Sequence, residues 1–560
     1  MTTLPTSRIR HSGIFSLLNR RTCRMKYSFP SRRSQVMSTK GMVATSQPLA
    51  AQAGASVLQQ GGNAIDAAIA TAAVLNVVEP MSTGLGGDAF ALIYINHSKE
   101  LKALNASGRA PYAANLEKLW SLGYSKIPEI GIHTVTIPGA LDGWCTLLEE
   151  YGTMSLAQVL APAIDLAEHG FPVMPITAHL WKEHSAKLKS NASAAGTYLI
   201  AGRTPEPGEI FVQPDLARTL KKIAERGRDV FYKGEIAEAI VACSQENGGL
   251  ITLRDLSDHT STWVTPIHTN YRGYDIYECP PNGQGLVVLL ALNVLEGYDL
   301  KSLGHNSPDY LHLLIAALKL AFADADRYVA DPDFTDIPLE KLLSKPYAKG
   351  RRQLIDMKKA QREVAAGALN VKGDTVYLAV TDKEGNSVSF INSLYRPFGS
   401  GIVVEGTGIC LQNRGSTFSL EPSHPNCIKP HKRPYHTIIP AMAFKDGNLF
   451  LTLGVMGGFM QPQGQVQVLL NIIDFDMGVQ TALDAPRFRY YVQDNKCVFE
   501  SGIPPGVLQE LAKRGHGVAK SDDPYSQEFG GGQIIMIKPQ TKVLEGGSDP
   551  RKDGCAIGVW

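Results

Sequence analysis

The 560-residue sequence has no strong excess of charge of either sign. Its 55 lysine and arginine residues nearly balance 53 aspartate and glutamate residues, so the formal net charge is only +2. No basic face and no alternation of basic with aromatic residues stands out after the first 35 residues. Nucleic acids are bound through clustered positive charge, so we expect no nucleic-acid partner.

Long apolar runs and metal-ligand patterns are also missing. No run of 18 apolar residues occurs, whereas a helix needs about 20 to span a bilayer, so we expect no membrane anchor. The eight cysteines form no CxxC pair and no His/Cys ligand spacing. This pattern favours reduced, mostly buried thiols over disulfides or a zinc site.

Acidic residues are absent from the amino-terminal part of the chain until Asp66. Residues 1–30 are instead rich in arginine and serine, which is typical of an organellar transit peptide and not of a secretory signal. A start at Met25 would remove most of this extension and leave a cytosolic form. A disordered basic tail without targeting function is the other interpretation. We therefore expect an intracellular protein, cytoplasmic or mitochondrial.

The remainder has a normal globular composition, with 44% hydrophobic and 19% charged residues in 60.7 kDa, and shows no internal repeat or low-complexity linker. Helical patterns come first and strand patterns later. We expect helices over 48–60, with Ser46 as a possible cap, over 65–78, and over 309–327, capped by Ser307. We expect strands over 89–94, 376–380 and 449–455, with a hairpin turn at 383–386.

The most informative short segment is Gly373-Asp374-Thr375, directly before the strand-like run 376–380. A threonine at a free amino terminus supplies a hydroxyl nucleophile and, in its α-amino group, a base with a reference pKa of about 7.7–8.0. This chemistry requires cleavage between Asp374 and Thr375, and Gly373 would tolerate the strained backbone. An Asp-Thr pair before a strand is otherwise usually a turn or a cap.

Several longer motifs surround this segment in a fixed order. They are 46–50 (SQPLA), 61–68 (GGNAIDAA), 78–80 (VEP), 84–88 (GLGGD), 138–139 (PG), 432–434 (KRP), 456–458 (MGG), 484–487 (DAPR) and 547–554 (GSDPRKDG). Together with Asp374-Thr375, they resemble the γ-glutamyltranspeptidase family of N-terminal nucleophile hydrolases over nearly everything after residue 30.

The resemblance implies an α+β fold, the αββα four-layer sandwich of N-terminal nucleophile hydrolases. It also implies a large subunit of residues 31–374 and a small subunit of residues 375–560 that carries the nucleophile. Gly457 and Gly458 match the family's oxyanion pair, although a plain tight turn is the alternative. Ser393 matches the hydroxyl residue that bonds the nucleophile's amino group, or it satisfies a strand end.

The substrate pocket departs from the family pattern. In glutamyl-specific members an arginine in an Arg-Glu-x-Ala-Pro motif binds the α-carboxylate, whereas here Ser107 takes that place and Arg109 follows two residues later. The acidic residue that holds the α-ammonium corresponds to Thr417. The remaining substrate-binding positions correspond to Tyr395, Arg414, His436 and Thr437.

Loss of the acid weakens the case for γ-glutamyl recognition, because an ammonium taken out of water needs a counter-charge. Arg109, Arg414 and His436 would instead bind a carboxylate without a neighbouring amine, although each arginine could equally lie at the surface. We therefore expect an autoprocessed amidohydrolase that acts through an acyl-Thr375 intermediate on γ-glutamyl or small carboxylate-bearing amides.

Two other interpretations remain open. One is an oxamate-type amidohydrolase without γ-glutamyl activity, since 392–395 (NSLY) and 108–111 (GRAP) look more like that branch of the family. The other is a non-catalytic relative that binds ligands. The expected partners are a small amide, water, and the two subunits of one precursor. No metal or organic cofactor is implied, because the chain supplies nucleophile, base and oxyanion donors.

Overall fold

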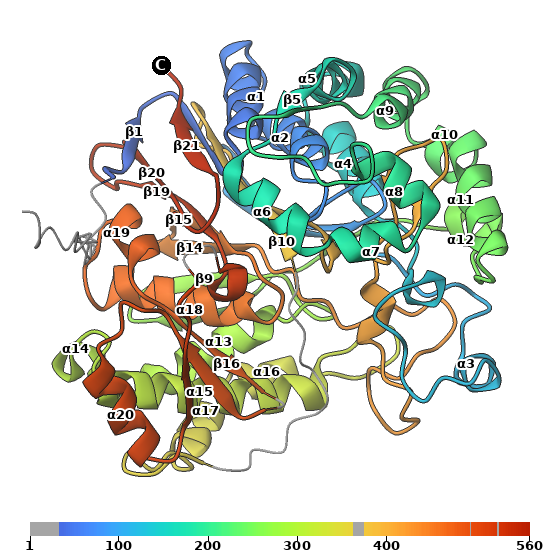
Figure 1. The fold of residues 1–560 in the computed structure, drawn as a ribbon. Coiled ribbons are helices and arrows are strands. Elements are labelled where there is room, and N and C mark those ends of the chain that lie inside the picture. The colour runs from blue at the N-terminus through green and yellow to red at the C-terminus, as the bar shows by residue number, and fades with distance from the viewer. Residues whose placement is uncertain (1–32, 362–373, 493, 524–525) are drawn as a thin grey trace, which may run out of the picture.

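The computed structural model describes residues 33–361, 374–492, 494–523 and 526–560 (Figure 1). The extension of residues 1–30, with Met25, and the glycine at 373 lie outside the described residues, so the expectations for them stay predictions. Within the described ranges, no helix is long and apolar enough to cross a membrane. The seven described cysteines are free thiols, six of them buried.

Two seven-stranded sheets, with antiparallel neighbours throughout, form the centre of the molecule. The first runs β1 (Val36–Ser38), β20 (Leu544–Ser548), β19 (Gly532–Ile537), β15 (Asn448–Val455), β14 (Ala441–Lys445), β9 (Tyr274–Glu278), β8 (Ile267–Tyr271). The second runs β21 (Cys555–Gly558), β2 (Gly41–Thr45), β10 (Asp374–Asp382), β11 (Ser387–Tyr395), β3 (Asp88–Ile95), β4 (Glu100–Ala106), β7 (Thr262–Val264).

Three small sheets lie outside these layers. They are formed by β5 (Phe171–Pro172) with β6 (Ile210–Phe211), by β12 (Val403–Val404) with β13 (Ile409–Cys410), and by β16 (Phe488–Tyr491), β17 (Lys496–Phe499) and β18 (Gly517–Lys520).

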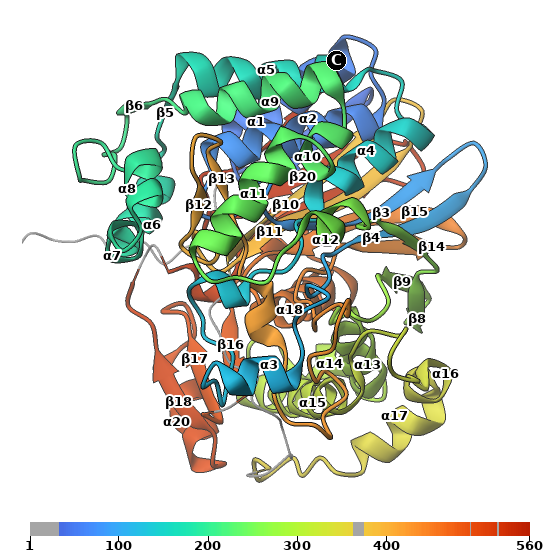
Figure 2. The same cartoon turned by 90° about the vertical axis from the view of Figure 1, so that its right-hand side faces the viewer.

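Helices cover the outer face of each large sheet, which gives the four layers seen in Figure 2. The helices above the second sheet and around it are α1 (Pro48–Gln59), α2 (Ala64–Val78), α4 (Ala140–Tyr151), α5 (Leu156–His169), α6 (Pro175–Glu183), α7 (Ser185–Lys189), α8 (Ala192–Tyr198), α9 (Pro214–Arg226), α10 (Asp229–Tyr232), α11 (Glu235–Glu246) and α12 (Leu253–Ser257). The short helix α3 (Leu116–Ser121) lies apart from them, in the lower part of Figure 2.

The helices on the side of the first sheet are α13 (Gly285–Leu295), α14 (Leu300–Leu303), α15 (Pro308–Tyr328), α16 (Leu339–Leu343), α17 (Lys345–Arg352), α18 (Met460–Ile473), α19 (Val479–Asp484) and α20 (Pro505–Lys513). Single 3₁₀ turns are η1 (Ile132–Thr134), η2 (Arg414–Thr417) and η3 (Gln527–Phe529). The predicted αββα sandwich is thus confirmed.

The sequence explains these layers because apolar residues fill every interface. One core lies between the second sheet and its helices, one between the first sheet and its helices, and a third between the two sheets. All residues of α2 and α13 are buried, as their nearly unbroken apolar sequences require. Between the sheets, Gly454 leaves room for the ring of Tyr377, whose atoms lie 2.3 Å from the place a Cβ would take.

The expected local elements are present, with one correction. The predicted helices correspond to α1, α2 and α15, and the predicted strands to β3, β10, β11 and β15. Asn63 caps α2 in a capping box with Asp66, and Ser307 caps α15. Ser46 does not cap α1. Its hydroxyl donates to Glu79 over 2.5 Å, and Gln47 is the cap residue.

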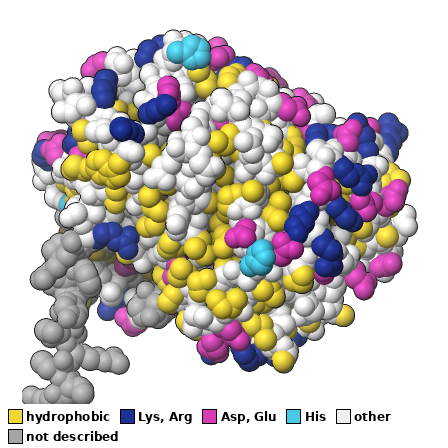
Figure 3. All heavy atoms as spheres, turned by 90° about the horizontal axis from the view of Figure 1, so that it is seen from above, with side chains coloured by type: hydrophobic (Ala, Val, Ile, Leu, Met, Phe, Trp, Pro, Cys, Tyr) yellow, Lys and Arg dark blue, Asp and Glu magenta, His cyan; other side chains and the backbone are white. Residues whose placement is uncertain are grey.

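Both large sheets combine strands from before and after residue 374. Strand β10 lies between β2, from the first part of the chain, and β11, from the second. A break before Thr375 would therefore leave the two parts joined by backbone ladders and shared cores. On the face shown in Figure 3, basic and acidic side chains are interspersed among apolar ones.

Candidate active site

Thr375 lies at an irregularity in the pairing of β10 with β11. Asp374 pairs with Tyr395 and Val376 with Asn392, so Ser393 and Leu394 lie opposite the single residue Thr375. The Leu394 amide leaves the ladder and donates to the Ser82 carbonyl over 3.1 Å. Bulges of this kind re-aim side chains. Here the buried hydroxyls of Thr375 and Ser393 meet at 3.1 Å.

Ser393 connects Thr375 to a buried cation. Its Oγ accepts a hydrogen bond from the Tyr395 amide over 2.8 Å and another from Nη2 of Arg414 over 3.2 Å. Tyr395 has a left-handed backbone with φ of 79°, which is rare for a bulky residue. This turn places its ring 4.2 Å from the Arg414 guanidinium, within cation–π range.

The Arg414 guanidinium is fully buried, and η2 delivers it to the site. Its Nη1 donates to Thr437 over 2.6 Å. Burial lowers the pKa of Arg414 to about 10, so the group keeps its charge at neutral pH. No carboxylate of the described residues lies within ion-pairing distance of this guanidinium, and its Nε has no hydrogen-bond partner there. A buried charge in such surroundings is costly.

The turn that carries Arg414 is held from both sides. The Thr417 hydroxyl donates to the carbonyls of Arg414 and Tyr435, at 2.9 and 2.8 Å. Gly415 allows close approach to η1, because a Cβ there would lie 2.7 Å from the Thr134 carbonyl.

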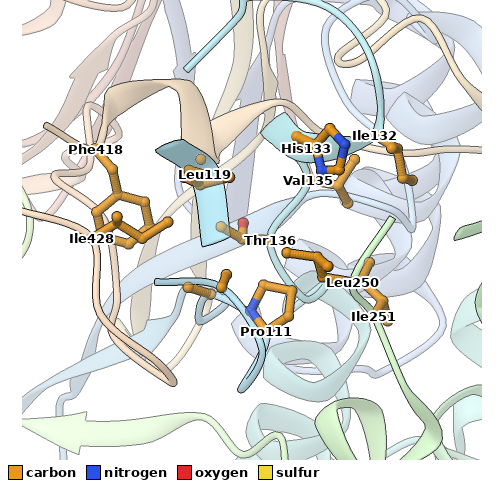
Figure 4. Close-up of a pocket in the computed structure, with 13 residues that line it drawn as sticks. Pro111, Leu119, Ile132, His133, Val135, Thr136, Leu250, Ile251, Phe418 and Ile428 are labelled. Carbon is orange, nitrogen blue, oxygen red and sulfur yellow. The ribbon is translucent and has the colours of Figure 1, made fainter. Parts of the chain in front are cut away.

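The apolar pocket beside η2, between Phe418 and Ile428 on one side and Ile132 and Val135 on the other, has a volume of about 20 Å³ (Figure 4). This is room for about one water molecule. Thr375, Ser393 and Arg414 are not among its lining residues, so this pocket is separate from the candidate active site.

The other two proposed carboxylate partners form hydrogen bonds with other groups. His436 is fully buried. Its Nε2 forms a hydrogen bond with Oδ2 of Asp88 at 3.0 Å, and its Nδ1 accepts one from the Ile438 amide at 3.4 Å. Burial lowers the pKa of His436 to about 3. Arg109 donates to the carbonyl of Thr260 over 3.2 Å. Of the three, the structure places only Arg414 in contact with the partner of Thr375.

Gly457 and Gly458 form the connection from β15 to α18, with φ of 115° and 61°. Their carbonyls accept hydrogen bonds from the amides of Met460 and Gln461. Within the described ranges, no acceptor contacts either glycine amide. Free amides at a helix start suit a developing oxyanion.

Sequence reasoning missed two residues that organise this site. Gln284 donates to the carbonyls of Thr437 and Gly458, at 2.7 and 2.9 Å, and so joins the arginine site to the glycine turn. Asp88 accepts hydrogen bonds from three separate segments. A signal existed only for Asp88, as the single charged residue at the start of an apolar strand.

Comparison with known proteins places this arrangement in a family. The family model described as Gamma-glutamyltranspeptidase matches residues 50–559. The chain belongs to the γ-glutamyltranspeptidase family. It is therefore an enzyme, an amidohydrolase of the glutathione hydrolase type, as the sequence motifs predict.

Individual relatives cover almost the whole chain. The "Glutathione hydrolase-like YwrD proenzyme" of Bacillus subtilis is 42% identical, covering 94% of this chain and 99% of the relative. The "Oxamate amidohydrolase proenzyme" of Klebsiella pneumoniae is 35% identical, with coverage of 94% and 99%. The crystal structure of cephalosporin acylase from Bacillus halodurans has a TM-score of 0.90 at 45% identity, with coverage of 96% and 98%.

Proposed function

We propose that this γ-glutamyltranspeptidase family member cleaves its own chain between Asp374 and Thr375. The Thr375 hydroxyl attacks the Asp374 carbonyl, and the acyl group moves from nitrogen to oxygen. Water then hydrolyses the ester, which releases the Asp374 carboxylate and the free α-amine of Thr375. The bulge opposite Thr375 and the name "proenzyme" carried by the relatives support this step.

The mature enzyme hydrolyses amides through the same hydroxyl. The α-amine of Thr375 takes the hydroxyl proton, and Oγ1 attacks the substrate carbonyl. The amides of Gly457 and Gly458 stabilise the oxyanion, and Ser393 orients Thr375. The amine leaves with the proton, and water hydrolyses the acyl-Thr375 ester. Nucleophile, base and oxyanion donors all come from the protein.

The preferred acyl group is a small one that bears a carboxylate and lacks an α-amine. One observation carries this proposal: the fully buried Arg414 guanidinium, 3.2 Å from Ser393 Oγ, has no carboxylate partner among the described residues. A substrate carboxylate would supply the missing charge and form the strong, directional pair that guanidinium favours. The named oxamate amidohydrolase relative is consistent with such a substrate.

Hydrolysis of γ-glutamyl amides such as glutathione is the second candidate, supported by the glutathione hydrolase-like relative. Against this candidate, Thr417 stands at the position of the family's ammonium-binding acid and carries no negative charge. Its hydroxyl already donates to the carbonyls of Arg414 and Tyr435. An α-ammonium would also lie close to the Arg414 charge, and like charges repel in a buried site.

The test compares kcat/KM for oxamate with that for glutathione and γ-glutamyl-anilide. We expect oxamate to be preferred. Arg414→Met should raise KM for oxamate by about 100-fold, because removal of one partner from a buried charge pair costs about 2–5 kcal/mol. Self-cleavage should continue, because the attacking and attacked groups belong to Thr375 and Asp374, whereas Arg414 bonds Ser393 and Thr437.

Arg109→Met is the matched control. It removes the same charge from a side chain that donates to the Thr260 carbonyl and not to Ser393. It should change KM less than about threefold. Two results would contradict the proposed acyl specificity and favour the γ-glutamyl candidate. They are a much higher kcat/KM for glutathione than for oxamate, and an equally small change of KM in Arg414→Met and Arg109→Met.

A further inference from the structure

His436 forms a hydrogen bond with Asp88 and directly precedes Thr437, which accepts a hydrogen bond from Arg414. On one side its Nε2 is 3.0 Å from Oδ2 of Asp88. On the other it is close enough to Arg414 for that charge to lower its pKa, after burial as the larger cause. The edge-to-face contact with Phe90, at 4.9 Å between ring centres, fixes the plane of the imidazole.

The hydrogen bonds of His436 define its protonation. The Ile438 amide donates to Nδ1 over 3.4 Å, so Nδ1 carries a lone pair and Nε2 carries the proton. Nε2 therefore donates to the Asp88 carboxylate. With its pKa lowered to about 3, the ring is a neutral donor at any working pH.

Asp88 receives neutral donors at both oxygens. Oδ1 accepts from the Gly108 amide and from Nε2 of Gln412, each at 2.8 Å, while Oδ2 accepts from His436. No ion pair joins this carboxylate to Arg414 in the described part of the chain. Two opposite charges in one buried site would ordinarily pair. Asp88 lies opposite Ser393 across β3 and β11, and Ser393 accepts the bond from Arg414. Oδ2 of Asp88 is nevertheless bonded to the neutral ring of His436.

We propose that His436 determines substrate specificity: by occupying Oδ2 of Asp88, it keeps Asp88 from pairing with Arg414 and leaves the guanidinium for the carboxylate of the substrate. This inference rests on the proposed function. Without the imidazole, Asp88 turns Oδ2 to Arg414. The guanidinium is then neutralised, and the site loses its preference for an anionic acyl group.

The experiment measures ammonia release from oxamate and from oxamide, its uncharged isostere, and takes the ratio of the two kcat/KM values. The ratio is informative because a loss in the chemical step lowers both kcat/KM values equally and so leaves their ratio unchanged. We expect the wild-type ratio to be about 100, because a buried charge pair contributes about 2–5 kcal/mol to binding. His436→Ala should lower it at least about tenfold, whereas His436→Gln, whose Nε2 can still donate to Asp88, should keep it within about threefold.

A double variant separates this role from simple structural support. In Asp88→Asn/His436→Ala no carboxylate remains to pair with Arg414, so the ratio should return toward the wild-type value. If His436→Ala does not fold, His436→Leu, which also removes the donor to Asp88 but keeps more of the side-chain volume, replaces it in both comparisons.

The outcomes distinguish the two proposals. A wild-type ratio near one would refute the proposed acyl specificity and this inference with it. A high wild-type ratio that persists in His436→Ala would refute the inference alone. A low ratio in the double variant, as low as in His436→Ala, would show that His436 acts by packing and would also overturn it.

Discussion

Two fully buried arginines should respond very differently to the same substitution. Arg414 has no carboxylate partner among the described residues, whereas Arg487 pairs with Asp549 at 2.6 Å, with both side chains almost completely buried. Replacing each with methionine keeps most of the side-chain volume and removes the charge. The comparison therefore sets a buried arginine without an ion pair against one that has an ion pair.

The magnitude for Arg414 follows from its pKa. Burial lowers this value from 12.5 to about 10, and each unit corresponds to about 1.4 kcal/mol, so the charged form is disfavoured by about 3 kcal/mol. Arg414→Met removes this cost but also the bonds to Ser393 and Thr437, worth about 1 kcal/mol each, and the buried cation–π contact with Tyr395, worth about 1–2 kcal/mol. The net expectation is a change in stability close to zero.

Arg487→Met should instead destabilise the protein by about 3–5 kcal/mol, because it removes several buried hydrogen bonds. The charged bond to Asp549 is worth about 1.5–3 kcal/mol, and the bonds to the carbonyls of Phe529 and Leu483 are worth about 1 kcal/mol each. Arg551 still pairs with Asp549 in this variant. Both substitutions are made in the Thr375→Ala protein, so that every sample is a single uncut chain. Calorimetry should show a nearly unchanged Tm for Arg414→Met and a Tm lowered by several degrees for Arg487→Met. Equal losses of Tm would refute the description of Arg414 as a buried, unpaired charge held ready for substrate.

Three further predictions concern cleavage, turnover and pH. The purified enzyme should run as fragments of roughly 40 and 20 kDa, with Thr375 at the start of the smaller one, and Thr375→Ala should remain one inactive chain; an active enzyme whose amino-terminal sequencing shows no Thr375 start would disprove this. Gly458→Val should lower turnover by about 100-fold or more, because a β-branched residue at φ of 61° distorts the turn; unchanged turnover in a folded variant would remove the oxyanion assignment. The pKa of His436 is about 3 in the folded protein and 6.5 in the unfolded chain. Between these pH values the unfolded chain binds more protons than the folded one, so stability falls as the pH drops from 6.5 toward 3. Urea unfolding at pH 7.5 and 4.5 should show a smaller loss for His436→Gln than for the wild type, and equal losses would contradict a buried neutral imidazole.

Local features of this protein follow from the sequence alone. Asn63 and Ser307 cap helices where polar residues precede apolar periodic segments, because a cap depends only on neighbouring residues. Strands β10 and β15 follow alternating and apolar runs for the same reason. The adjacency of Asp374 and Thr375, with ordered motifs along the chain, was sufficient to indicate the family and its four-layer sandwich.

Only the tertiary structure decided which charged groups share the site. Arg109, Arg414 and His436 form one group by sequence comparison, yet only Arg414 contacts Ser393, 21 residues away along the chain. His436 faces Asp88 across 348 residues. Such contacts arise where β3, β11 and the η2 turn pack together, and no spacing in the sequence encodes that distance. The charge state of a buried group follows from its neighbours in space, so the unpaired guanidinium and the neutral imidazole became visible only in the folded chain.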